Sequence, residues 1–207
     1  MVKIIKDALI LCVITVAAGL GLGAVYGVTK EPIEKVNYET QQNAYKTVFE
    51  NASEFKDLPD FSSEEATKIA ADNGYGDTIE NCVQAVEADG SLLGYVITVV
   101  SHDGYAGDIK FSIGVQLDGT LNGYSITDIN ETAGLGMKAK EESFYSQFQD
   151  KQVEQFTVTK TGSADDSEID AISGATITSS AVTNGVDAGL AYFRSLLETT
   201  GGELLNE

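Results

Sequence analysis

The chain has 207 residues and a formal net charge of −19 at neutral pH. A hydrophobic content of 43% with only two prolines excludes wholesale disorder, and the length suits one globular domain with appendages. Residues 1–30 hold three lysines and one aspartate, so the remainder carries −21, and a surface that acidic repels nucleic acid.

An uncharged apolar segment runs from Ala8 to Val28. Its 21 residues would form a helix roughly 31 Å long, enough to cross the hydrocarbon core of a bilayer. Lys3 and Lys6 precede it and an acidic chain follows, which predicts a cytoplasmic N-terminus. We expect residues 1–30 to be the cytoplasmic N-terminus and transmembrane anchor of a single-pass protein of the cytoplasmic membrane, with the C-terminal domain facing outside.

A cleaved signal peptide is the alternative interpretation of this segment. Such a peptide has a shorter apolar core and ends in small residues at its cleavage site, a pattern that Ala24-Val25-Tyr26 fits poorly. The length of the apolar segment therefore favours a retained anchor.

The cysteines and the single histidine limit the chemistry that the chain can carry by itself. Cys12 lies inside the apolar segment, so Cys82 has no disulfide partner in the outer domain. Two thiols are too few for an iron–sulfur cluster, which needs about four, and one imidazole is too few for a zinc site. A Ser–His–Asp site would depend wholly on His102, which we interpret as a loop residue. We predict no metal site and no catalytic residue.

Helical spacing marks residues 31–80, which we interpret as a stalk and helical segment. One helical face there carries three large apolar residues: Tyr45, Val48 and Phe49. A further helix is predicted from Ser62 to Asn73, because Ser62 and Glu65 form a capping box and Asn73-Gly74 is a typical helix end.

The period of the sequence then changes from helical to alternating. Asp-Gly pairs, which favour turns, separate the strand-like runs at residues 89–90, 103–104 and 118–119. The uniformly apolar run from Leu92 to Val100 predicts a central strand. The run from Ile109 to Leu117 alternates strictly, which predicts a strand with one buried face, and Leu121 to Ile129 should pair with it.

A glycine-containing loop, Glu131 to Gly136, follows the predicted sheet. We then expect a short helix near Lys140 to Phe148 and a strand from Val153 to Thr159. Apolar residues at helical spacing predict a long closing helix: Val182, Val186, Leu190, Phe193 and Leu197. The predicted fold class is α+β, a single N-terminal transmembrane helix followed by a twisted, mostly antiparallel sheet with flanking helices. Residues 81–200 form its main domain, and residues 201–207 a C-terminal tail.

One stretch near the C-terminus carries the chemistry, and it reads Asp170-Ala171-Ile172-Ser173-Gly174-Ala175-Thr176-Ile177-Thr178-Ser179. This loop of small residues delivers Thr176 to the first turn of the closing helix, where unsatisfied backbone N–H groups favour a phosphate. The alternative is an ordinary helix cap, in which a hydroxyl of Ser173, Thr176 or Thr178 bonds its own backbone. The physical pattern alone leaves both interpretations open.

The pattern Asp-x-x-Ser-Gly-Ala-Thr at residues 170–176 resembles the flavinylation motif of the FMN-binding domain family. The resemblance implies that residues 81–200 form an FMN-binding domain, and that a flavin transferase moves FMN from FAD onto Thr176 as a covalent phosphoester. It also implies that the aspartate serves recognition by the transferase or a metal during attachment, and that the small residues shape the phosphate turn. These implied residues are Asp170, Ser173, Gly174 and Ala175.

The loop at residues 131–136 is similar to a second element of that family, usually Glu-Thr-Pro-Gly-Leu-Gly, which lies near the flavin. This chain departs from the pattern at Ala133, where proline is usual. The run Gly104-Tyr105-x-Gly107 matches the family as well. The resemblance implies that four residues of the loop line the isoalloxazine ring: Thr132, Gly134, Leu135 and Gly136.

With its anchor, the whole chain is similar to the G subunits of the Rnf electron-transport complexes. The resemblance implies an electron-relay subunit with covalent FMN in a membrane ferredoxin:NAD⁺ oxidoreductase coupled to Na⁺ or H⁺ translocation. Its partners would be the other membrane subunits and, during maturation, the flavin transferase, and the subunit would not be catalytic alone. The alternatives are a stand-alone exported flavoprotein, a C-type subunit of NADH:quinone reductase, and a non-redox exported binding module.

Overall fold

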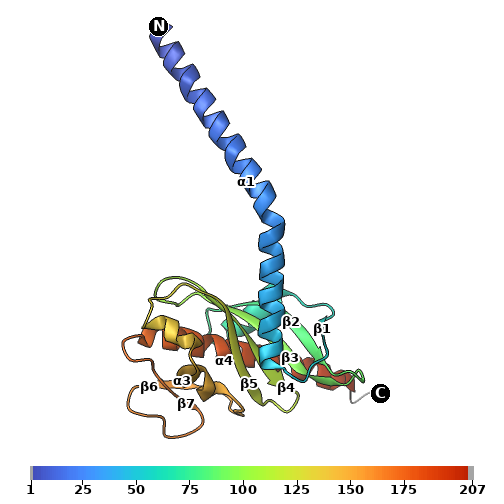
Figure 1. Ribbon diagram of the computed structural model, residues 1–207. Coiled ribbons are helices and arrows are strands. Elements are labelled where there is room, and N and C mark those ends of the chain that lie inside the picture. Colours follow the sequence, from blue (N-terminus) through green and yellow to red (C-terminus); the bar gives the residue numbers. More distant parts are fainter. Residues whose placement is uncertain (1, 205–207) are drawn as a thin grey trace. The chain divides into compact units, whose positions relative to one another are not determined.

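The computed structural model describes residues 2–204, and the chain forms two compact units, Met1–Gln42 and Asn43–Glu207. Most of α1 (Val2–Val48) makes up the first unit (Figure 1). Within the described residues, α1 is the one helix that is long and apolar enough to cross a membrane, and its large apolar side chains from Ile4 to Tyr38 are exposed, as expected of a helix surrounded by lipid. Met1 of the predicted cytoplasmic N-terminus and residues 205–207 of the predicted tail lie outside the described residues.

A five-stranded antiparallel sheet is the centre of the second unit (Figure 1). Its strands follow chain order: β1 (Glu54–Asp57), β2 (Thr78–Val86), β3 (Leu92–Ser101), β4 (Ile109–Gln116) and β5 (Leu121–Ile129). The prediction that residues 92–100 form the central strand is confirmed. The pairing of β4 with β5 is also confirmed, across a turn in which Gly119 has φ +88° and the Asp118 side chain accepts the N–H of Thr120.

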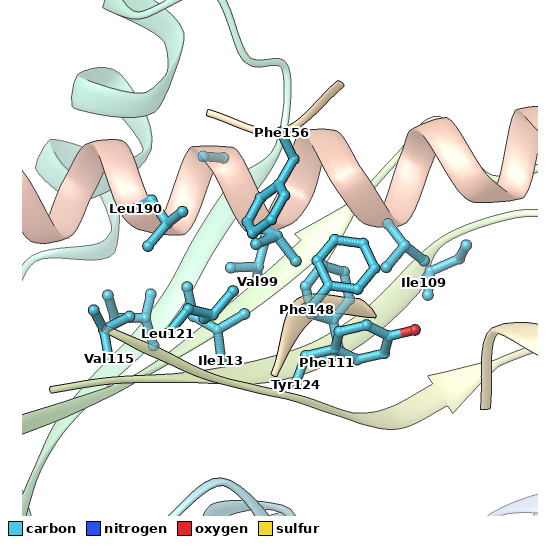
Figure 2. Close-up of a cluster of buried hydrophobic side chains, with 14 of the residues drawn as sticks. Val99, Ile109, Phe111, Ile113, Val115, Leu121, Tyr124, Phe148, Phe156 and Leu190 are labelled. Carbon is cyan, nitrogen blue, oxygen red and sulfur yellow. The ribbon is translucent and has the colours of Figure 1, made fainter. Parts of the chain in front are cut away.

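Helices α2 (Ser63–Asp72) and α4 (Thr176–Leu204) belong to the layer that covers one face of the sheet. The Ser62 half of the predicted capping box of α2 is confirmed, because Ser62 Oγ accepts the N–H of Glu65 at 3.3 Å. Figure 2 shows the core between α4 and the sheet, to which α4 contributes Leu190 and the strands contribute Val99 and Ile113. The helical spacing of apolar residues therefore predicted the buried face of α4 correctly.

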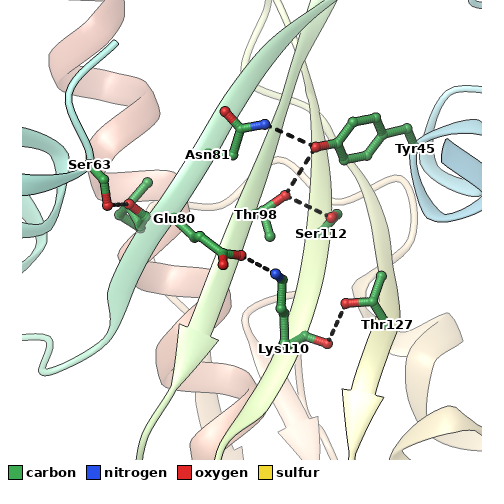
Figure 3. A network of polar contacts seen from close by, with 9 residues as sticks. Tyr45, Ser63, Glu80, Asn81, Thr98, Lys110, Ser112 and Thr127 are labelled. Atoms are coloured by element: carbon green, nitrogen blue, oxygen red, sulfur yellow. Dashed lines mark hydrogen bonds and ion pairs between the residues drawn. The ribbon is translucent and has the colours of Figure 1, made fainter. Parts of the chain in front are cut away.

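The other face of the sheet is covered by residues 45–49, at the end of α1. Val48 lies so close to Gly114 that a Cβ on that glycine would stand 2.8 Å from Val48 Cβ and from its carbonyl oxygen. Figure 3 shows the polar contacts on this face, where the Tyr45 hydroxyl lies 3.5 Å from Thr98 Oγ1 and Thr98 lies 3.0 Å from Ser112 Oγ. The prediction that β4 has one buried face was therefore wrong, because this covering layer buries Ser112 and Gly114 too.

Short elements connect the sheet to α4: η1 (Gly136–Lys140), α3 (Glu142–Tyr145), η2 (Ser146–Phe148), β6 (Thr157–Thr159) and β7 (Glu168–Asp170). The helix expected near residues 140–148 is thus a series of short turns. Of the strand expected from Val153 to Thr159, only the last three residues, Thr157–Thr159, form a strand. The Phe156 N–H donates to Asp187 of α4, so it does not pair with a neighbouring strand. β6 pairs with β7 in parallel, and the predicted α+β class is confirmed.

Candidate functional site

A cavity of about 550 Å³ lies where three segments of the second unit meet. The segments are the loop before β4, the loop after β5 and the first turn of α4. The lining residues are Tyr105, Glu131, Thr132, Leu135, Gly136, Gly174, Ala175, Thr176, Ile177 and Thr178. The volume falls within the range of roughly 300–1,000 Å³ that is usual for pockets that bind small molecules.

Thr176 is the first residue of α4 and is half-buried in the wall of the cavity. The chain turns into the helix at Gly174, whose φ of +79° favours glycine, and the Ala175 N–H donates to the Ile172 carbonyl at 2.9 Å. The first N–H groups of a helix have no intrahelical partner and carry the positive end of its dipole. The threonine hydroxyl therefore stands where a phosphate is electrostatically favoured.

Ser179 fixes this turn from inside the helix. Its hydroxyl accepts the N–H of Ile172 at 2.9 Å and donates to the Ala175 carbonyl at 3.0 Å. All three residues are buried. The loop that presents Thr176 is therefore held to the first turn of α4 by a buried side chain.

Glu131 is a buried carboxylate in the cavity wall, with 8% of its surface exposed. Its Oε1 accepts the N–H of Ala106 at 3.2 Å, whereas its buried Oε2 has no hydrogen-bond partner among the described residues. Gly136 lies against this carboxylate, since a Cβ there would stand 2.6 Å from Glu131 Oε2 and from Thr178 Oγ1. The absence of a side chain at 136 thus makes room for two polar groups.

Apolar side chains gather at the same cavity. Over the described part of the second unit, four large hydrophobic side chains are exposed, and Tyr105 (69%), Leu135 (41%) and Ile177 (53%) are three of them. All three line the cavity, whereas Leu117 does not. Exposed apolar side chains that cluster on an acidic domain indicate a surface that a ligand or partner covers.

Six of the nine residues predicted to bind the cofactor line this cavity: Thr132, Leu135, Gly136, Gly174, Ala175 and Thr176. Asp170, Ser173 and Gly134 do not. Asp170 ends β7, where Gln147 pairs with its backbone and Ser163 contacts its carboxylate. Ser173 is exposed, and Gly134 supplies a turn with φ +75°.

Four lining residues were missing from the predicted set: Tyr105, Glu131, Ile177 and Thr178. Each stands inside or beside a motif that the sequence had already marked. Tyr105 belongs to Gly-Tyr-x-Gly, Glu131 opens the glycine loop, and Ile177 and Thr178 follow the threonine of the flavinylation motif. The motifs gave the signal, but only the folded chain shows that these side chains reach the cavity.

His102 lies outside the lining of the cavity. Its Nε2 is 2.9 Å from Thr78 Oγ1 and its Nδ1 is 3.0 Å from Asp108 Oδ1, and all three groups are accessible to solvent. These contacts tie β2 to the loop before β4. Across the described residues, no three His, Cys, Asp or Glu side chains are grouped so that they could hold a metal ion.

One family model matches the region that contains the cavity, and the whole chain has relatives among known proteins. The model of the FMN-binding domain matches residues 104–191, which include every lining residue. The G subunit of the Na(+)-translocating ferredoxin:NAD(+) oxidoreductase complex of Acetobacterium woodii is 33% identical over 196 residues, which are 93% of each chain. The G subunit of the proton-translocating ferredoxin:NAD(+) oxidoreductase complex of Clostridium ljungdahlii is 32% identical over 97% of this chain and 94% of that one. The crystal structure of Shewanella oneidensis NqrC covers 57% of this chain and 61% of its own, with 21% identity and a TM-score of 0.48.

Proposed function

We propose, because this chain belongs to the family of G subunits of ion-translocating ferredoxin:NAD(+) oxidoreductase complexes, that it relays electrons in such a complex through FMN joined to Thr176 as a phosphoester. The observation that carries the proposal is the position of Thr176. It is the first residue of α4 and lines a cavity inside the part of the chain that matches the FMN-binding domain.

The residues of the cavity fit FMN. A helix start beside a threonine hydroxyl suits the phosphate. The exposed apolar side chains of Tyr105, Leu135 and Ile177 suit a flat aromatic ring system. The cavity therefore offers separate surfaces for the charged and the aromatic ends of one ligand.

The protein supplies attachment and orientation, whereas the bound FMN supplies the electron transfer itself. Thr176 contributes one oxygen, and Gly174 with Ala175 forms the turn that presents it. Thr132, Leu135 and Gly136 would line the ring. Ser173 and Asp170 lie outside the cavity, and they would contact the flavin transferase during maturation.

The N-terminal segment would fix the subunit in the membrane and set its orientation. α1 would anchor the subunit among the other membrane subunits of the complex. Lys3 and Lys6 precede the apolar span, and the chain after residue 30 carries −21, so the FMN domain would face outside.

Flavin retention after denaturation tests the attachment. The full chain, co-expressed with a flavin transferase, should show a flavin-fluorescent band on a denaturing gel, and Thr176→Ala should lose it. Thr176→Ser should keep part of the label because it keeps a hydroxyl. Thr199→Ala, which removes an exposed threonine of the same helix, is the matched control and should label fully. A labelled Thr176→Ala chain would contradict the proposal, and an unlabelled wild type would favour a non-redox binding module.

A further inference from the structure

Glu131 is a buried acid with one satisfied and one unsatisfied oxygen. Oε1 receives the Ala106 N–H, and Oε2 is enclosed without a hydrogen-bond partner in the described chain. Leaving such an oxygen unpaired is costly, and native proteins do so rarely, so each case calls for an explanation. A donor from outside the chain would supply the missing partner.

The position of Glu131 indicates which part of a ligand could be that donor. Ala106, which Oε1 holds, follows Tyr105, and Gly136, beside Oε2, follows Leu135. The carboxylate therefore lies between the two segments that carry exposed apolar side chains into the cavity. This is the side suited to an aromatic ring, and the polar edge of an isoalloxazine ring carries an N–H donor.

Two glycines keep this arrangement open. A Cβ on Gly104 would stand 2.1 Å from the Gly107 carbonyl and 3.1 Å from Glu131 Oε1. A Cβ on Gly136 would meet Oε2 at 2.6 Å. Both substitutions would push on the carboxylate, so the backbone on both sides is shaped around it.

We propose that Glu131 binds the flavin ring, with Oε1 holding the Tyr105 loop in place and Oε2 accepting the ring N–H. This inference rests on the proposed function and adds to it a residue that tunes the cofactor. A carboxylate beside the ring disfavours added electron density, so Glu131 lowers the midpoint potential of the flavin. Because the effect comes from charge and hydrogen bonding, it is separable from attachment at Thr176.

The test compares Glu131→Gln with Asp187→Asn in the full flavin-loaded chain in detergent. Both changes turn a buried carboxyl group that accepts one backbone N–H into an amide of the same shape, but Asp187 is not part of the cavity lining. We expect the flavin that Glu131→Gln carries to have a more positive midpoint potential than the flavin of wild type, and a shifted visible absorption band. Asp187→Asn should match wild type in both measurements. An unchanged Glu131→Gln, or an equal shift in Asp187→Asn, would overturn the inference.

A second measurement needs no variant, in case Glu131→Gln fails to fold. The redox-difference infrared spectrum of wild type should contain a carboxylate band that moves when the glutamates carry ¹³C at the carboxyl carbon. Absence of that band would also overturn the inference. A wild-type chain without covalent flavin would instead contradict the proposed function, and this inference would fall with it.

Discussion

Ser179 Oγ accepts the backbone N–H of Ile172 at 2.9 Å, and this bond joins the loop that presents Thr176 to the helix that follows it. Removing the hydroxyl leaves a buried N–H without its partner, which costs about 1–3 kcal/mol. We expect Ser179→Ala to lower the free energy of unfolding by that amount and to slow flavin attachment. Urea titration and the rate of flavin labelling measure the two effects. Ser180→Ala, at the neighbouring half-buried position, should change neither, and a Ser179→Ala chain that behaves as wild type would show that the loop needs no such tie.

A methyl group at position 136 should damage the cavity. The Cβ of Gly136→Ala would stand 2.6 Å from both Glu131 Oε2 and Thr178 Oγ1, so one of these groups must move. Overpacking of this kind costs about 1–3 kcal/mol, and we expect a lower melting temperature together with less flavin per chain. Gly76→Ala is the control, because its Cβ would meet nothing within 4 Å. Full flavin loading of Gly136→Ala would contradict the close packing described above.

Asp187 should make the domain less stable as the pH rises. Burial is the main reason that the pKa of Asp187 is raised, to about 7, from an ordinary value near 3.8, while the N–H of Phe156 and the charge of Arg194 oppose the shift. The folded state therefore holds the proton more tightly than the unfolded chain does. Its stabilising contribution is full below about pH 4 and is lost as the pH rises through about 7.

The expected loss is on the order of a few kcal/mol, since one pKa unit corresponds to about 1.4 kcal/mol. Asp187→Asn keeps an oxygen for the Phe156 N–H but cannot ionise. We expect its unfolding free energy to fall less steeply than that of wild type between pH 4 and 7, and to exceed it at pH 8. Asp128→Asn, at an exposed position, should follow the wild-type slope. Parallel slopes for wild type and Asp187→Asn would contradict the assignment.

Thiol labelling can establish which side of the membrane the domain faces. Cys82 should not react with the reagent, because it is buried and burial raises the pKa of its thiol to about 12. A cysteine introduced as Asp57→Cys, at an exposed position of β1, should react with an impermeant reagent in right-side-out vesicles. Asp7→Cys, before the apolar span, should react only after lysis. The opposite pattern would place the domain in the cytoplasm.

Local patterns predicted the parts of the fold that depend on local interactions. The cap of α2 involves Ser62 and Glu65, three residues apart, and the buried face of α4 follows from helical spacing alone. The burial of Ser112 and Gly114 could not be predicted in this way. The residues that cover them lie more than sixty positions earlier in the chain, and no periodicity within β4 reports that contact.

The candidate site also has one part that a local pattern predicted and another part that it could not predict. Thr176 stands in a contiguous motif, so the sequence identified it directly. Tyr105 and Glu131 contribute to the cavity only because the loop before β4, the loop after β5 and α4 converge. Their convergence depends on the register of the sheet and on the packing of α4, and a linear pattern contains neither.

The burial of residues 45–49 against the sheet decides where the domain can be separated from its anchor. A protease that cut between residues 31 and 42 would shed a particle with both faces of its sheet covered, since the second compact unit begins at Asn43. A cut after Phe49 would instead remove the residues that cover Val83 and Val96, and it would expose an apolar surface that favours aggregation. Cleavage that leaves the domain intact must therefore fall before Asn43, several residues before α1 ends at Val48. A domain released from the membrane has to keep the last turn of α1.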